Sequence, residues 1–197
     1  LGLLKMDFLG LRNLSVIDNA RKLIQRREPG FSMDAVPEDD SETFAMLAEG
    51  RTSGGFQFES GGMTRLLVQS RADSIEDLIA IISLYRPGPM QFIPAYLENR
   101  RDTGKIRYRD EKLRPILGVT FGCIIYQEQV MRIFRELAGY SLGRADIVRR
   151  AMSKKKHDVL EREKQIFIQG PRREDGSWEV EGCVNRGVAE SVAEALF

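Results

Sequence analysis

The sequence predicts a mainly α-helical chain with a few short strands, and three observations lead to that prediction. Apolar side chains recur at the three- and four-residue spacing of an amphipathic helix in two stretches, residues 16–24 and 130–137. Runs typical of strands are few and short. Proline and glycine clusters divide the chain into segments of helical length, most clearly at Arg86-Pro87-Gly88-Pro89 and at Gly139.

The first third of the chain alternates short extended runs with helices. Residues 3–9 form an apolar run that we expect to be a buried strand. The first helix carries the apolar stripe of residues 16–24 and ends before Pro29-Gly30. A short helix over residues 41–49 comes next. Paired glycines then bracket residues 56–59, a predicted strand or extended segment, and another helix follows them.

The middle of the chain contains a helix with a clear beginning and a clear end. Ser74-Ile75-Glu76-Asp77 resembles a capping box, in which a hydroxyl group is followed three residues later by an acid. The apolar helix that it begins continues to Leu84. Residues 86–89 end it, because two prolines and a glycine do not continue a helix.

The last third is predicted to be helical after one short β-prone run, residues 122–126. An amphipathic helix begins at Gln127, and Gly139-Tyr140-Ser141 ends it. We expect the remaining elements to be a basic helix, a charged helix, a surface turn and a final helix, at about residues 144–156, 155–169, 171–176 and 188–197 respectively.

Composition excludes several classes of protein. The chain has 197 residues, enough for one large domain or two small ones, and is 42% hydrophobic and 30% charged, as is typical of soluble globular proteins. No apolar run approaches the roughly 18 to 20 residues of a membrane-spanning helix. The chain starts at Leu1 with no signal segment, so we interpret it as a piece of a longer protein.

The two cysteines, Cys123 and Cys183, lie far apart and have no second cysteine or histidine nearby in the sequence. This spacing argues against a zinc site and is typical of free thiols in a reducing compartment. We therefore expect a cytoplasmic protein.

The strongest functional signal is the basic run between Arg144 and Lys156, where six lysines and arginines accompany a single acid, Asp146. The whole chain has a net charge of only +1, so this positive charge is concentrated locally. Such a run on a helix suits a polyphosphate partner, either a nucleotide or a nucleic-acid backbone. The alternative is a solvated helix face. The adjacent pair Arg149-Arg150 and the apolar residues between the charges favour the first interpretation.

Two other positions are candidate functional residues. Asp7 is either a capping residue or a metal ligand, and no second acid lies near it in the sequence, although a Mg²⁺ site needs more than one oxygen ligand. Arg86 stands at a rigid turn, and a preorganised guanidinium suits phosphate or carboxylate. The single histidine, His157, follows the lysines, and no triad or metal cluster can be built around it.

Taken together, the sequence resembles the α subunits of bacterial DNA polymerase III, the C-family replicative polymerases. Seven segments carry the resemblance, in the family's order and across nearly the whole chain. They are residues 5–11 (KMDFLGL), 56–60 (FQFES), 76–80 (EDLIA), 84–89 (LYRPGP), 126–131 (YQEQVM), 138–142 (AGYSL) and 145–156, which begins with Ala145-Asp146 and contains Arg149-Arg150-Ala151-Met152 before the lysines.

The resemblance implies a division into a palm remnant, residues 1–12, and a helical fingers domain, residues 13–197. Asp7 would be a catalytic carboxylate, one of three that bind two Mg²⁺ ions. The residues expected to contact the incoming nucleotide are Lys5, Arg86, Arg149 and Arg150. Those expected to contact nucleic acid are Lys154, Lys155 and Lys156.

The implied activity is DNA-directed DNA polymerisation by a longer parent protein. The other two palm carboxylates of the family are absent from this sequence, so we expect the chain to be inactive by itself. The implied partners are primer–template DNA and dNTP, with a sliding clamp, a proofreading exonuclease and a clamp loader bound through other parts of the parent. Ser153 departs from the family, which more often has glycine there, and this leaves the local backbone shape open.

Two rival functions remain from the residues alone. A non-catalytic nucleic-acid-binding module would use the basic helix only for backbone phosphates, and its DNA affinity would fall steeply with salt. A structural or interaction domain would leave the same helix solvated, with no affinity for DNA or nucleotide.

Overall fold

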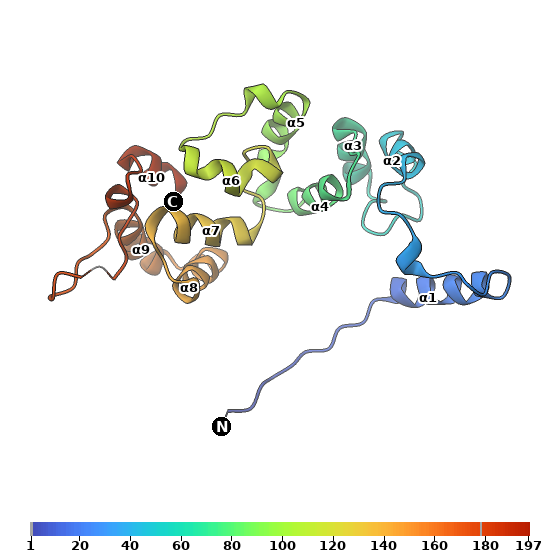
Figure 1. Cartoon of the computed structure of the whole chain (residues 1–197), viewed down its shortest axis with the longest axis horizontal. Helices are drawn as coiled ribbons and strands as arrows, with labels where there is room; N and C mark the ends of the chain where they lie inside the picture. The colour runs from blue at the N-terminus through green and yellow to red at the C-terminus, as the bar shows by residue number, and fades with distance from the viewer. Residues whose placement is uncertain (1, 178) are drawn as a thin grey trace. The chain divides into compact units, whose positions relative to one another are not determined.

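The computed structural model describes residues 2–177 and 179–197, and its architecture confirms the mainly α prediction (Figure 1). The chain divides into two compact units, Leu1–Ile75 and Glu76–Phe197. None of the helices in the described residues is long and apolar enough to cross a membrane.

The described residues of the first unit form the α-helices α1 (Arg12–Gln25), α2 (Ser41–Ala48) and α3 (Gly61–Ser70). α1 buries none of its residues, whereas α2 and α3 pack together through a small core. Its buried members are Phe44, Leu47, Met63, Leu66 and Leu67. Asp40 and Ser60 begin α2 and α3 as side-chain caps, since each accepts a hydrogen bond from a backbone N–H of the first turn.

The first helices of the second unit are α4 (Ile75–Leu84), whose first residue ends the first unit, and α5 (Ile93–Arg101). They share a core with Cys123 and Ile125. The helices are also joined by polar side chains, because the buried carboxylate of Asp77 pairs with Arg100 and accepts a hydrogen bond from the Tyr96 hydroxyl at 3.2 Å. Pairing of this kind compensates for the burial of a charge.

The rest of the second unit surrounds a larger core. Its helices are α6 (Arg114–Leu117), α7 (Gln127–Ala138), α8 (Leu142–Ser153), α9 (His157–Gln169) and α10 (Glu190–Leu196). Phe134 of α7 lies at the centre of an aromatic cluster, with its ring centroid 5.1 Å from Tyr140 and 4.7 Å from Phe167 of α9. This cluster joins α7, the α7–α8 turn and α9.

The predicted strands are wrong, because the structure contains no β-strand in residues 2–177 or 179–197. A strand requires a partner for its backbone groups. Residues 3–9, the expected palm strand, have none within the described chain and are exposed. Residues 56–58 form a turn instead, with Gln57 in a left-handed conformation, and Glu59 has no regular structure.

The β-prone run at residues 122–126 is not a strand for a specific reason. The backbone N–H groups of Ile125 and Tyr126 both donate to the side-chain oxygen of Gln129, at 2.8 and 2.9 Å. The Gln129 amide group in turn donates to the Thr120 hydroxyl at 2.7 Å. A buried side chain of α7 thus satisfies the donors that a neighbouring strand would otherwise have satisfied.

Both cysteines are free and buried. Burial raises the pKa of the Cys123 thiol to about 11 and that of the Cys183 thiol to about 12. A raised thiol pKa means that the folded protein favours the protonated form, so both thiols stay neutral at pH 8.

We predict that both thiols react slowly with Ellman's reagent at pH 8 in the folded protein and quickly in denaturant, because the thiolate is the reactive form. The folded rate should be lower than the unfolded rate by at least about a hundredfold, since burial limits both the thiolate fraction and access. A fast native reaction of one or two thiols would contradict the burial described above.

Candidate phosphate-binding site

The basic run forms α8, and local signals fix where this helix begins. Gly139, in a left-handed conformation, ends α7. The Ser141 hydroxyl then caps α8 by accepting a hydrogen bond from the backbone N–H of Arg144 at 3.3 Å. Ala145, Val148 and Ala151 recur at three-residue intervals and are buried, so α8 packs through one stripe. The charged side chains therefore lie on its other faces.

Arg149 and Arg150 share one carboxylate, that of Asp146. Arg149 donates to Asp146 Oδ1 from Nε at 2.9 Å and from Nη2 at 2.7 Å. Arg150 Nη2 lies 2.7 Å from Asp146 Oδ2. The hydrogen bond from Arg149, followed by the charges of both arginines, holds the pKa of Asp146 below its ordinary value. The two arginines thus form a fixed pair with a shared counter-ion.

α8 ends in a turn that carries the three lysines. Lys155 adopts a left-handed conformation, and the backbone N–H of Lys156 donates to the Ala151 carbonyl at 3.0 Å. Ser153 remains helical and donates its hydroxyl to the Arg149 carbonyl at 3.1 Å. Serine at this position therefore does not disturb the local backbone, because the left-handed residue of the turn is Lys155.

A cavity of about 210 Å³ lies at this end of α8, and its lining combines cationic with apolar side chains. The lining residues are Ile147, Arg150, Ala151, Lys154, Lys156 and Val159. The side chains of Lys154, Lys155 and Lys156 are exposed and have no ion-pair partner within the described residues. Carbonyl groups at a helix C-terminus favour cations, so the helix stabilises these lysines but does not itself attract an anion. Any affinity for phosphate comes from the side chains.

Arg144, the first cation of the basic run, differs from the lysines because it is held in ion pairs within the protein. Its guanidinium pairs with Glu163 of α9 at 3.0 Å and with Glu179 at 2.5 Å, and only 19% of its side chain is exposed. Glu163 also accepts a hydrogen bond from the Tyr140 hydroxyl at 2.9 Å. Burial, followed by the Glu163 carboxylate, raises the pKa of Tyr140. Arg144 therefore links α8 to α9 and is not available to a ligand.

The remaining predicted site residues do not line this cavity. Lys5 and Asp7 lie in the first unit, with the Lys5 Nζ 3.8 Å from Asp7 Oδ1 and 77% of the Asp7 side chain exposed. Arg86, in the second unit, is exposed at the predicted turn, where the backbone N–H of Met90 donates to its carbonyl at 3.2 Å.

The residues present do not by themselves make a magnesium site. Among the described residues no three His, Cys, Asp or Glu side chains are grouped to hold a metal ion. Asp7 offers one exposed carboxylate, and Mg²⁺ is held by several oxygen ligands in near-octahedral geometry.

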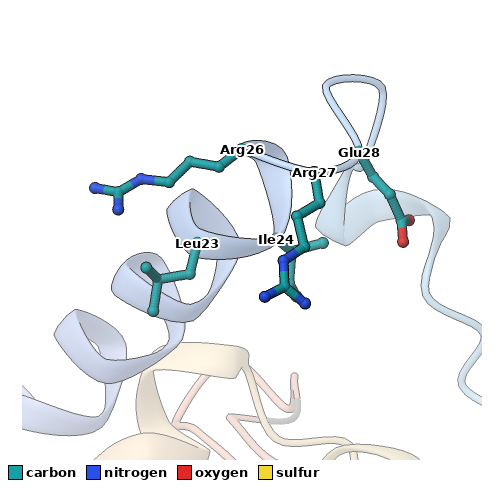
Figure 2. Close-up of a pocket in the computed structure, with 5 residues that line it drawn as sticks. All are labelled: Leu23, Ile24, Arg26, Arg27 and Glu28. Carbon is teal, nitrogen blue, oxygen red and sulfur yellow. The ribbon is translucent and has the colours of Figure 1, made fainter.

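Two further cavities are lined by residues outside α8. One, of about 490 Å³, lies at the end of α1 and is lined by Leu23, Ile24, Arg26, Arg27 and Glu28; Figure 2 shows Arg26 extending away from Arg27. The other, of about 460 Å³, is in the second unit, and Phe92, Tyr108 and Phe197 are among its lining residues. Each of these cavities is lined by two arginines, whereas the cavity at the end of α8 is lined by three cations, Arg150, Lys154 and Lys156.

Sequence reasoning missed two residues that contact the Arg149–Arg150 pair. Asp146 is not among the predicted site residues, although its spacing of three and four residues from the arginines is that of helical ion pairs. Gln127, at the start of α7, accepts a hydrogen bond from Arg149 Nη1 at 2.6 Å. No local signal could reveal that contact, because it joins two different helices.

Comparison with known proteins decides the family. A family profile described as "Bacterial DNA polymerase III alpha subunit finger domain" matches residues 13–175. The chain belongs to this family.

Relatives agree with the assignment. The DNA polymerase III subunit alpha of Borreliella burgdorferi is 50% identical over 196 residues, covering 100% of the chain and 16% of the relative. That of Treponema pallidum is 49% identical and covers 85% of the chain and 15% of the relative. That of Thermus aquaticus is 43% identical, and the match covers 100% of the chain and 16% of the relative. The chain therefore spans a small part of the length of these relatives.

We predict that Arg144→Ala lowers the free energy of unfolding by about 3 kcal/mol, because it leaves the Glu163 carboxylate, whose side chain is only 14% exposed, without its guanidinium partner. Arg150→Ala, at an exposed position, should change it by less than about 0.5 kcal/mol. Urea denaturation of both variants tests this, and equal effects would contradict the distinction between a structural and a surface arginine.

Proposed function

We propose that the chain is the part of a replicative DNA-directed DNA polymerase that grips the triphosphate of the incoming dNTP. The observation that carries this proposal is the cavity at the end of α8, which is lined by Arg150, Lys154 and Lys156 and where Asp146 holds Arg150 in an ion pair. The finger-domain family of the chain supports the same function.

The chemistry of these side chains fits a triphosphate. A guanidinium offers paired N–H donors that match two phosphate oxygens, and lysines add point charges. Arg149 and Arg150 on α8 would neutralise the triphosphate and hold it in line for attack. This is catalysis by positioning and electrostatic stabilisation, and it needs no proton transfer from the fingers.

Lys154, Lys155 and Lys156 would contact the backbone of primer–template DNA, because they lie exposed on a turn next to the cavity. Lys5 and Arg86, which lie outside the cavity lining, are also proposed to contact the incoming nucleotide. Their support is the family resemblance, since neither residue lines the cavity.

Asp7 is proposed as a catalytic carboxylate and as one ligand of the two Mg²⁺ ions that the family implies. Residues 1–12 would then belong to the palm, and residues 13–197 to the fingers. The chain alone is expected to be inactive, since one carboxylate does not complete a two-metal site.

The parent is proposed to act in the cytoplasm with primer–template DNA, dNTP, a sliding clamp, a proofreading exonuclease and a clamp loader. The two buried free thiols suit that reducing compartment.

A non-catalytic nucleic-acid-binding module is the second candidate, and the exposed lysine turn favours it. The two functions differ in their response to salt and to nucleotide. Backbone binding alone would weaken steeply with salt and would leave dNTP without effect.

Arg150→Ala in the full-length subunit is expected to raise the apparent Kd of dNTP by at least about tenfold, the loss of one charge-assisted hydrogen-bonded contact. Single-turnover nucleotide addition at varied dNTP concentration measures this. Arg132→Ala is the matched control, because it removes an exposed, ion-paired arginine from α7. An unchanged dNTP affinity in Arg150→Ala would overturn the proposal.

Asp7→Asn in the full-length subunit is expected to slow single-turnover addition by roughly a thousandfold or more, about 4 kcal/mol of barrier, with primer–template affinity retained. Asp18→Asn is the control, since Asp18 is a helix-surface carboxylate paired with Arg21 and Lys22. A near-normal rate in Asp7→Asn would remove Asp7 from the metal site.

A further inference from the structure

The arginines of the α8 pair differ in how many of their donors the protein already uses. A guanidinium has five N–H groups. Arg149 directs Nε and Nη2 to Asp146 and Nη1 to Gln127, and only 21% of its side chain is exposed. Arg149 is therefore fixed between α8 and α7.

Arg150 keeps most of its donors available. Its ion pair with Asp146 is made through Nη2, 67% of its side chain is exposed, and it lines the cavity together with Lys154 and Lys156. The Asp146 carboxylate thus holds the partly buried guanidinium of Arg149 with one oxygen and the exposed guanidinium of Arg150 with the other.

We propose that Asp146 is a positioning residue for nucleotide binding, holding Arg149 against α7 and placing the Arg150 guanidinium at the cavity. This inference rests on the proposed function, since it assumes that Arg150 meets a phosphate group. Gln127 also holds Arg149 in place, because its side-chain oxygen accepts a hydrogen bond from Arg149 Nη1. Asp146 does not itself touch the nucleotide.

The energetic reason is preorganisation. An arginine that is free in solution must lose rotamer freedom when it binds a ligand, and a side chain that is already held loses less. Ion pairs on a helix surface contribute little to folding. The contribution of Asp146 should therefore appear in nucleotide affinity and not in stability.

An opposite role for Asp146 is physically possible and makes the proposal testable. As a counter-ion, the carboxylate competes with phosphate for the same guanidinium groups. If competition dominated, removing Asp146 would tighten nucleotide binding. If positioning dominates, removing it weakens binding.

The test uses the full-length subunit with Asp146→Ala, and with Glu136→Ala as the matched control. Glu136 is also a helix-surface carboxylate paired with an arginine, Arg132, but it lies on α7 and holds no residue of the cavity. Apparent Kd for dNTP, maximal addition rate and primer–template Kd are measured for each variant. The Km for pyrophosphate in the reverse reaction is measured too, because that ligand carries only phosphate groups.

Asp146→Ala is expected to raise the Kd of dNTP and the Km of pyrophosphate by about fivefold, with primer–template Kd within about twofold of the parent value. Asp146→Glu, which keeps a carboxylate at helical ion-pair spacing, should recover most of the affinity. Gln127→Ala should raise the Kd of dNTP and the Km of pyrophosphate by a smaller factor. This variant tests the positioning role independently if Asp146→Ala fails to fold.

Two outcomes would overturn the inference: a lowered dNTP Kd in Asp146→Ala, or values equal to those of Glu136→Ala. The arginine variant separates this failure from failure of the proposed function. If Arg150→Ala weakens dNTP binding and Asp146→Ala does not, the result contradicts only the positioning role of Asp146. If neither variant changes dNTP affinity, the result contradicts the proposed function as well.

Discussion

The packing of α8 against α7 and α9 is the constraint on which the rest of the site depends. Ala145, Val148 and Ala151 bury one stripe of the helix, and two of these are alanines, so α8 lies close to its neighbours. In a helix of 3.6 residues per turn, fixing one stripe fixes the direction of every other side chain. The positions three and four residues after Asp146 therefore place Arg149 against α7 and the exposed Arg150 at the cavity.

The six cations of the basic run have different roles because their surroundings differ. Arg144 is paired across to α9 and is structural, Arg149 is fixed between two helices, and Arg150 and the lysines remain accessible. The helical spacing of Asp146 from both arginines could be read from the sequence. The partners of Arg144 and Arg149 could not, because Glu163 and Gln127 come from other helices, and a helical pattern carries no information about contacts between helices.

The helices were predictable because their signals are local. The proline turn after Leu84, the glycine after Ala138 and the amphipathic spacing in α7 each act within a few residues. The strands were predicted wrongly because strand formation depends on a distant partner. The run at residues 122–126 has strand-like composition, yet the Gln129 side chain satisfies its donors. The apolar run at residues 3–9 is exposed here, and the role proposed for Asp7 rests on the family resemblance, since no group of three possible metal ligands occurs among the described residues.

The central claim, that the cations at the end of α8 bind the triphosphate of an incoming nucleotide, is tested most directly by a structure of the full-length subunit with primer–template DNA and dNTP. We expect an Arg150 nitrogen within about 2.7 to 3.2 Å of a nucleotide phosphate oxygen, with Arg149 still held by Asp146 and Gln127. Contact of these side chains with DNA backbone phosphates alone, or with solvent, would contradict it and favour a binding module.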